Sequence, residues 1–133
     1  MCRLFFCFLM GIMFLISCGC GPKLPYPVVA FSGTVTYQGE PVPGLPIAFI
    51  PEVGRPSNAF SDKDGKFNFV YTVEKDGVQT GNGTFCVALG PTDGRLYNNR
   101  ELLETIAKKY STGNEYLKVE ITKKEKNYEL KLE

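Results

Sequence analysis

Short stretches in which apolar and polar side chains alternate fill residues 29–132, and this period of two constrains the fold more than any other feature. In the first stretch Phe31, Val35 and Tyr37 fall on one side, and Thr34 and Thr36 fall on the other. Successive side chains of a strand point to opposite faces of a sheet, so each stretch predicts a strand with one buried face. The seven predicted strands centre on residues 29–37, 45–49, 59–60, 67–71, 85–89, 117–121 and 128–132.

Glycine and proline mark the connections between these strands. Gln38-Gly39-Glu40 predicts a turn, and Asp64-Gly65 lies between two apolar stretches, which is typical of a hairpin. Prolines at positions 41, 43 and 46 cannot donate ladder hydrogen bonds, so the second strand should begin irregularly or at an edge. Residues 74–83 are polar and rich in glycine, and they predict a loop.

One helix is predicted, over residues 98–110. Asn98 followed by Glu101 has the spacing of a capping box, and Lys108 and Lys109 suit the negative end of the helix dipole. One apolar stripe should face the core: Leu102, Leu103, Ile106 and Tyr110. Seven short strands and this late helix predict an all-β class, a seven-stranded β-sandwich, and about 105 residues suffice for a single core of that kind.

The N-terminus has the features of an export signal. Arg3 precedes a 13-residue apolar run, residues 4–16, which as a helix would be about 20 Å long. A bilayer core needs about 30 Å, so the run is too short to span it and has the length of a secretory signal. Leu15-Ile16-Ser17-Cys18 resembles the lipobox of bacterial lipoproteins. The resemblance implies diacylglyceryl transfer to the Cys18 thiol, cleavage between Ser17 and Cys18, and usually acylation of the new amine.

The alternative is an ordinary secretory leader with a coincidental cysteine, since Cys2 and Cys7 also lie in the leader. We therefore expect a signal peptide at 1–17, a Gly/Pro-rich tether at 18–28 and a β-sandwich domain at 29–133. Two cysteines remain beyond the anchor. Cys20 and Cys86 could pair in an oxidising compartment, but Cys20 lies in the tether, which favours two unpaired thiols.

Composition excludes several classes of function. The chain has no histidine, which removes Ser-His-Asp and Cys-His catalysis and His-containing zinc sites. Lys and Arg number 15 and Asp and Glu 14, and removal of residues 1–17 takes away only Arg3, which leaves 14 of each. The basic residues of 123–126 surround Glu125 and predict a solvated turn. We expect no enzyme, no cofactor and no nucleic-acid partner.

Two segments of the body also resemble a known family. They are 32–44, Ser-Gly-Thr-Val-Thr-Tyr-Gln-Gly-Glu-Pro-Val-Pro-Gly, and 61–67, Ser-Asp-Lys-Asp-Gly-Lys-Phe. They are similar to the opening hairpin and the T-D-x-D-G-x-F turn of carboxypeptidase regulatory-like domains, with Ser61 in place of the usual threonine. Residues 83–87 match the family's later strand, and Lys109-Tyr110 with 117–121 match a closing stretch found in small bacterial lipoproteins. The resemblance implies a transthyretin-like (prealbumin-like, Ig-like) Greek-key sandwich that is not itself catalytic.

Candidate binding residues are few. Asp62 and Asp64, with Glu40 or Asp93, could hold calcium, although no bidentate glutamate completes a calcium loop and a plain turn is the alternative. A carboxylate pair for glycoside hydrolysis has no marked cleft. Five aromatic residues could line a pocket, but their alternation predicts core positions: Phe60, Phe67, Phe69, Tyr71 and Phe85. Tyr26, Tyr97 and Tyr116 fall in loops or at strand starts and suit exposed contacts.

We therefore expect a lipid-anchored, non-enzymatic domain of the bacterial cell envelope, outside the cytoplasm and on the outer rather than the inner membrane. It would act as a binding or structural module. The anchor at Cys18 would make the membrane one partner, and an envelope protein or polysaccharide would be another. The alternatives are a small-molecule carrier of transthyretin type, and an adhesion or assembly protein that adds a partner's strand to a sheet edge.

Overall fold

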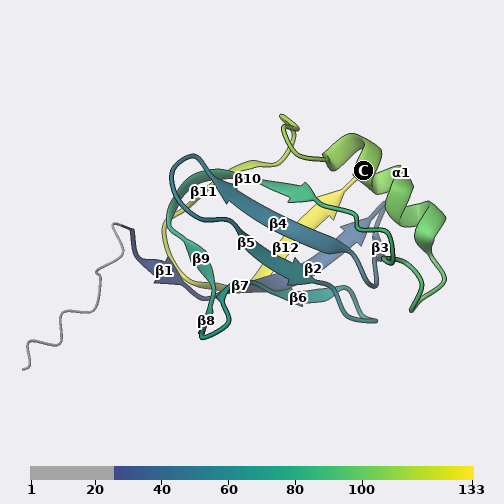
Figure 1. The fold of residues 1–133 in the computed structure, drawn as a ribbon, viewed down its shortest axis with the longest axis horizontal. Coiled ribbons are helices and arrows are strands. Elements are labelled where there is room, and N and C mark those ends of the chain that lie inside the picture. The colour runs from purple at the N-terminus through teal and green to yellow at the C-terminus, as the bar shows by residue number, and fades with distance from the viewer. Residues whose placement is uncertain (1–25) are drawn as a thin grey trace, which may run out of the picture.

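The computed structural model describes residues 26–133, which form two β-sheets packed face to face with one short helix at their side (Figure 1). This part of the chain is an all-β sandwich, as the alternation predicts. The predicted signal peptide, the attachment site Cys18, the neighbouring Cys20 and most of the predicted tether lie outside the described residues. Within residues 26–133 no helix is long and apolar enough to cross a bilayer.

The larger sheet is antiparallel and has six strands in the order β11-β10-β4-β5-β7-β8. Its strands are β4 (Pro46–Pro51), β5 (Ser57–Phe60), β7 (Val70–Thr72), β8 (Lys75–Asp76), β10 (Gly81–Val87) and β11 (Lys118–Ile121).

The smaller sheet is built around one long strand, β2. It contains β2 (Phe31–Tyr37), β3 (Glu40–Pro41), β6 (Lys66–Asn68) and β12 (Glu125–Leu132). The strands β3 and β6 pair with β2 in antiparallel fashion, whereas β12 runs parallel to it. A separate two-stranded pair joins β1 (Val28–Val29) to β9 (Val78–Gln79), so among residues 26–133 the first strand begins at Val28, one residue before the predicted boundary.

Three predictions are corrected. The predicted strand 29–37 breaks at Ala30, because Val29 belongs to β1, which pairs with β9, and β2 begins at Phe31. The predicted strand 67–71 breaks at Phe69, because β6 pairs with β2 in one sheet and β7 pairs with β5 in the other. At the crossing, the Phe69 N–H donates to the carbonyl of Phe31 at 3.0 Å. The predicted loop 74–83 is wrong as well, since it contains β8, β9 and the start of β10. Short strands with charged or glycine residues carry no period-two signal, which explains the error.

The helix α1 (Arg100–Tyr110) is present, but the predicted capping box is wrong. The N-cap residue is Asn99, whose side chain makes no capping hydrogen bond and instead donates to the carbonyl of Pro43 at 2.8 Å. Asn98 has a positive φ of 50° and precedes the cap. The predicted stripe is confirmed, with Leu103, Ile106 and Tyr110 buried and Leu102 packed against the core at partial exposure.

Aromatic rings fill the space between the two sheets. Phe31, Phe49, Phe67, Phe69, Phe85 and Tyr128 pack with ring centroids 5.0–6.0 Å apart. Phe67, Phe69, Tyr71 and Phe85 are buried as predicted. Phe60 is the exception: its side chain is 63% exposed, because it lies on the outer side of β5 rather than the inner one.

Candidate functional surfaces

Two of the calcium candidates, Asp62 and Asp64, lie in a tight turn between β5 and β6, whereas Glu40 lies in β3 and Asp93 lies between β10 and α1. Asp62 Oδ1 accepts hydrogen bonds from the backbone N–H groups of Asp64 and Lys66, both at 2.9 Å. Such an Asx-type turn uses the carboxylate to hold its own backbone. Asp93 Oδ2 likewise accepts the N–H of Gly90. The two backbone hydrogen bonds give Asp62 a structural role in the turn that passes the chain between the sheets. Within residues 26–133 no group of three side chains suited to a metal occurs.

Ser61, which precedes this turn, is buried and fully paired. Its hydroxyl donates to the carbonyl of Val42 at 2.6 Å and accepts the N–H of Leu45 at 2.8 Å. One side chain therefore satisfies two main-chain groups in the proline-rich segment before β4, where ladder hydrogen bonds are interrupted. This contact explains a buried hydroxyl residue at position 61.

The outer face of the smaller sheet is polar. Ser32, Thr34 and Thr36 of β2 lie between Lys66 of β6 and the β12 residues Glu129 and Lys131, which form an ion pair at 3.3 Å. These residues and their neighbours line an open groove of about 860 Å³. Glu129 and Lys131 are exposed, which confirms the outward positions that the alternation predicts for them. The same prediction is confirmed for Lys118 and Glu120 on β11 of the larger sheet. This is an ordinary solvated face of a sandwich.

The outer face of the larger sheet differs, because its central strands carry no charged side chain there. We call it the uncharged face and define it by Pro46, Ala48 and Ile50 of β4, Asn58 and Phe60 of β5, and Val70 of β7. The register makes these residues neighbours: Phe60 pairs with Pro46, and Asn58 lies between Ala48 and Val70. Phe60 is 63% and Val70 41% exposed.

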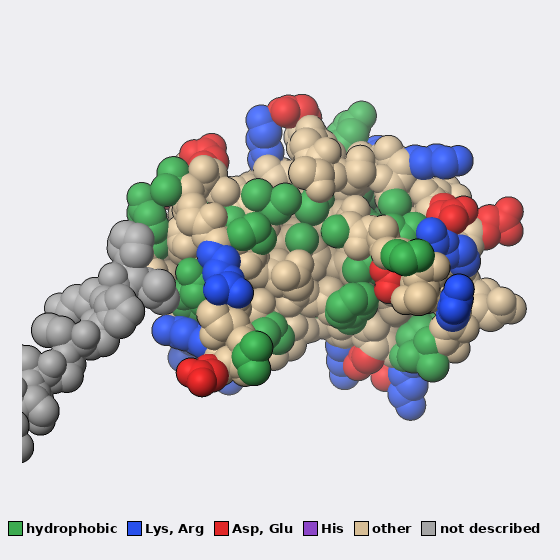
Figure 2. All heavy atoms as spheres, viewed as in Figure 1, with side chains coloured by type: hydrophobic (Ala, Val, Ile, Leu, Met, Phe, Trp, Pro, Cys, Tyr) green, Lys and Arg blue, Asp and Glu red, His purple; other side chains and the backbone are tan. Residues whose placement is uncertain are grey.

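Figure 2 looks onto this side of the molecule, where hydrophobic and uncharged atoms occupy the middle and charged side chains gather toward the rim. Of the six residues, Pro46 and Ala48 are buried and Ile50 is partly exposed, so Phe60 and Val70 supply most of the exposed apolar surface of this face. Neither the size of the side chains nor the period-two pattern predicts an outer face without charge. Its only trace in the sequence is that every outward position of β4, β5 and β7 lacks a charge.

A groove of about 590 Å³ adjoins the uncharged face, over β10 and β4. Ile50, Thr84, Cys86 and Thr112 line it, and the charged residues Lys118 and Glu120 also border it. Cys86 is a free, buried thiol whose Sγ lies 3.8 Å from Thr112 Oγ1. Burial raises the pKa of this thiol, and the hydrogen bond to Thr112 offsets only part of that effect. Cys86 is thus protonated near neutral pH and is a poor nucleophile.

The three tyrosines expected to be exposed are exposed. Tyr26 is 39%, Tyr97 36% and Tyr116 68% accessible. They do not form one site: Tyr116 packs edge-on against Tyr110 at 6.0 Å, and the Tyr97 ring lies over Gly44. No protein-family model, no curated protein and no solved structure matches this chain. The surfaces described above are therefore interpreted from their own geometry.

Proposed function

We propose that this chain is a lipid-anchored protein of the bacterial cell envelope whose sandwich binds a partner protein without catalysing a reaction. The anchor rests on Leu15-Ile16-Ser17-Cys18, on the short apolar run before it and on the Gly/Pro-rich segment after it. Acylation of both the Cys18 thiol and its amine would bury several acyl chains, which makes anchoring stable where one chain would not. The outer membrane remains our expectation for its location.

The uncharged face is the observation that carries the binding function. Phe60, which pairs with Pro46, is 63% exposed, and Val70, which pairs with Asn58 on the same face, is 41% exposed. Folding therefore leaves much of their apolar area in water. Covering these groups with a partner would remove apolar area from water at about 25 cal/mol per Å². The surrounding charged rim is the anatomy expected of a protein interface.

The absence of catalysis is supported by chemistry. The chain has no histidine, and the buried Cys86 thiol has a raised pKa. The carboxylate of Asp62 accepts two backbone hydrogen bonds within its turn. The carrier function has less support than the binding function, because both main grooves are open at the surface rather than enclosed, and ligand pockets bury most of their ligand.

We also propose the transthyretin-like Greek-key topology for the sandwich. The chain passes between the two sheets repeatedly: from β3 to β4, from β5 to β6, from β6 to β7 and from β11 to β12. Repeated crossing of this kind is characteristic of Greek-key sandwiches. The turn at Asp62 makes one of these crossings, and the break at Phe69 makes another.

The anchor is tested by the intact mass of the protein from membranes, beside a Cys18→Ala variant. We expect a species that begins at Cys18 with added acyl mass, and the loss of that species in the variant. An unacylated protein in the soluble fraction would refute the anchor.

Partner binding is tested in cells with a photo-crosslinking residue at Asn58, which is exposed in the middle of the uncharged face. The matched control places the same residue at Thr34, at the centre of the opposite, polar face. We expect one discrete adduct from position 58 that disappears when Phe60 is changed to Ser, and none from position 34. Equal labelling from both positions, or none from 58, would refute a binding role for this face.

A further inference from the structure

The end of the domain at which the described chain begins is built from several loops held around β9 and the start of β10. The N–H of Thr80 donates to the carbonyl of Pro27 at 2.9 Å, which fixes the entering chain. The side chain of Gln79 donates to the carbonyl of Val53 at 2.5 Å, and Gly81 pairs with Ile121 just before loop 122–124. We call this end the N-terminal pole and define it by residues 26–27 and loops 52–55, 72–75 and 122–124.

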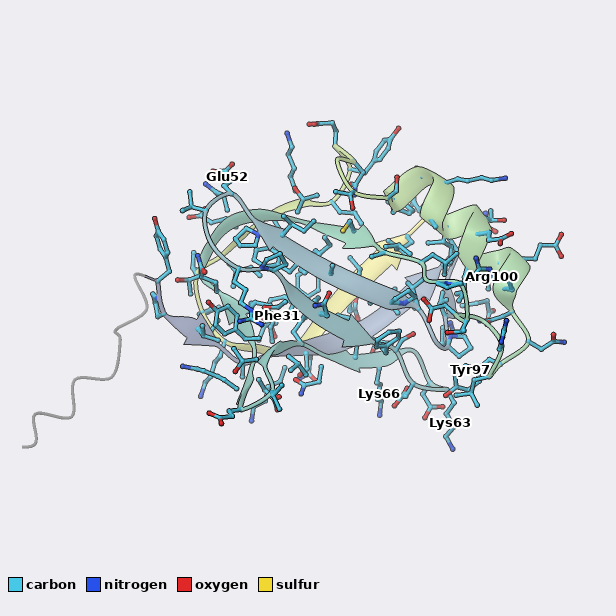
Figure 3. All side chains as sticks on the ribbon, viewed as in Figure 1. Phe31, Glu52, Lys63, Lys66, Tyr97 and Arg100 are labelled. Carbon is cyan, nitrogen blue, oxygen red and sulfur yellow. The ribbon has the colours of Figure 1, made fainter. Side chains whose placement is uncertain are left out.

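Figure 1 shows β1, β8 and β9 together at this end, and α1 at the other. In Figure 3, Glu52 lies on the side of the pole, whereas Tyr97, Arg100 and Lys63 lie at the far end. The turn 72–75 joins the pole because it belongs to the hairpin β7–β8, which continues directly into β9, the partner of β1.

The tips of these loops carry apolar side chains that the fold leaves uncovered. Val73 is 104% exposed, Val53 63% and Tyr26 39%. The tips of surface loops normally carry polar residues. Two exposed valines at the tips of different loops therefore indicate a contact surface. Tyrosine is enriched at membrane interfaces, where its ring is apolar and its hydroxyl is wet.

Charge accompanies the apolar tips. Lys123 and Lys124 are adjacent and exposed in loop 122–124. Arg55 and Lys75 add two further cations, and the acidic residues in or next to the same loops are Glu52, Glu74, Asp76 and Glu125. The Glu125 carboxylate accepts the backbone N–H groups of Lys126 and Asn127. Arg55 lies over the ring of Tyr71 at 5.9 Å and Asp76 accepts a hydrogen bond from Asn68, so these two side chains are engaged within the domain. The adjacent side chains of Lys123 and Lys124 therefore form the densest positive charge of the pole.

The length of the preceding chain determines what this pole can reach. Cys18 and Tyr26 are eight residues apart, which a fully extended chain spans in at most about 28 Å. A domain of this size has a radius of gyration of about 13 Å and is thus about 34 Å across. A lipid at Cys18 therefore limits the N-terminal pole to within about 28 Å of the bilayer, whereas the far end of the domain can lie up to about 62 Å away.

We propose that the N-terminal pole docks on the surface of an anionic phospholipid bilayer. Tyr26, Val53 and Val73 enter the interfacial region, and Lys123 and Lys124 contact lipid phosphates. This inference rests on the proposed lipid anchor at Cys18. Docking places the uncharged face at the side of the standing domain, free for a partner protein.

The test uses the absence of tryptophan from the chain. Val73→Trp and Phe60→Trp each introduce the only tryptophan of the chain, one at the pole and one on the uncharged face, and its emission is read apart from that of the seven tyrosines. Both replaced side chains are exposed, so the substitutions leave the core intact. Each full-length acylated variant is reconstituted in vesicles of phosphatidylethanolamine and phosphatidylglycerol, with and without brominated phospholipid. We expect blue-shifted, bromine-quenched emission from position 73 and no quenching from position 60.

A charge arm accompanies this test. Changing Lys123 and Lys124 together to Gln should weaken the quenching at position 73, as should vesicles of zwitterionic lipid alone. The matched control changes Lys63 and Lys66 to Gln on the turn and strand away from the pole, and it should have no effect.

Flotation of the same vesicles separates the two proposals. If the protein floats but position 73 is not quenched more strongly than position 60, the docking proposal is refuted and the anchor proposal stands. Protein that fails to float overturns both, because the inference depends on the anchor. Quenching at position 73 that the Lys123/Lys124 change does not alter overturns the assignment of lipid phosphate to the lysines.

Discussion

A substitution at Gly33 provides the most direct test of the way the two longest strands pair. Gly33 is buried in β2, opposite Tyr128 of the parallel strand β12, beside a shift in register between Glu125 and Tyr128. A Cβ at this position would overlap the carbonyl oxygen of Tyr128 and lie 2.7 Å and 2.9 Å from its carbonyl carbon and nitrogen. All three atoms belong to the main chain, so rotation of a side chain cannot relieve the overlap.

Two effects of Gly33→Ala oppose each other. Removing a glycine from the middle of a strand stabilises it by roughly 0.5–1 kcal/mol. Relieving the overlap requires β12 to move by about 1 Å, which strains two or three of the interstrand hydrogen bonds at about 1 kcal/mol each. Overpacking of a filled interior costs about 1–3 kcal/mol in general. The overlap should prevail, with a net loss of about 2 kcal/mol and a fall in Tm of about 8–16 °C.

Urea unfolding followed by circular dichroism measures this loss as a lower midpoint at unchanged slope. Thr34→Ala is the matched control, because its side chain lies on the outer face of the same strand and its loss should cost less than about 1 kcal/mol. Tyr128→Ala should not rescue Gly33→Ala. A variant as stable as the parent, or a rescue by Tyr128→Ala, would refute the main-chain contact between β2 and β12.

Five further substitutions, at four positions, test individual side chains. The Ser57 hydroxyl is buried without a partner, so Ser57→Ala should leave the unfolding free energy unchanged or raise it by up to about 1 kcal/mol, measured in urea; a loss above that would reveal a missed partner. Asp62→Ala should cost about 1–2 kcal/mol and Asp62→Asn much less, with no effect of added calcium on the midpoint; a calcium-dependent rise would restore the metal site. Because burial raises the pKa of Cys86, the unfolded chain loses this proton first, and stability should fall as pH rises above the ordinary thiol value of about 8.5. In Cys86→Ala, the unfolding free energy should not show this fall at alkaline pH. If the parent protein and the variant have the same pH profile of unfolding free energy, the prediction is wrong. Phe60→Lys should keep the midpoint within about 0.5 kcal/mol while raising solubility and abolishing the adduct from position 58; a strongly destabilised variant would place Phe60 in the core after all.

The period-two pattern predicts most of the sandwich because burial of one strand face is a local rule. Val35, Ile47, Phe49, Phe67, Phe85 and Leu130 are all buried where the alternation places them. The apolar stripe of α1 follows from the same logic with a period of 3.6. These elements are predictable because each residue's environment depends on its immediate neighbours in sequence.

The errors arise where distant contacts decide. Phe69 continues the alternation of its stretch, yet the chain passes from one sheet to the other at this residue. Its backbone N–H donates to the carbonyl of Phe31 in the smaller sheet, a contact that the local sequence does not show. Asn98 has the spacing of a cap, but Asn99 is positioned at the helix start by a hydrogen bond to Pro43, 56 residues earlier. The parallel pairing of β12 with β2 likewise joins the two ends of the domain. No local pattern encodes any of these pairings.

Phe60 shows why the uncharged face escaped the same rule. The prediction that Phe60 is buried assumes that an aromatic residue in an alternating stretch lies on the inner side of the strand. On β12 the outward positions include Glu129 and Lys131, but on β5 and β7 they include Phe60 and Val70, so apolar side chains occur on both the inner and the outer sides of these two strands. Folding gains little from this arrangement, because the exposed groups remain in water. The exposed Phe60 and Val70 are therefore not explained by folding, and this is the reason we propose that the uncharged face binds a partner.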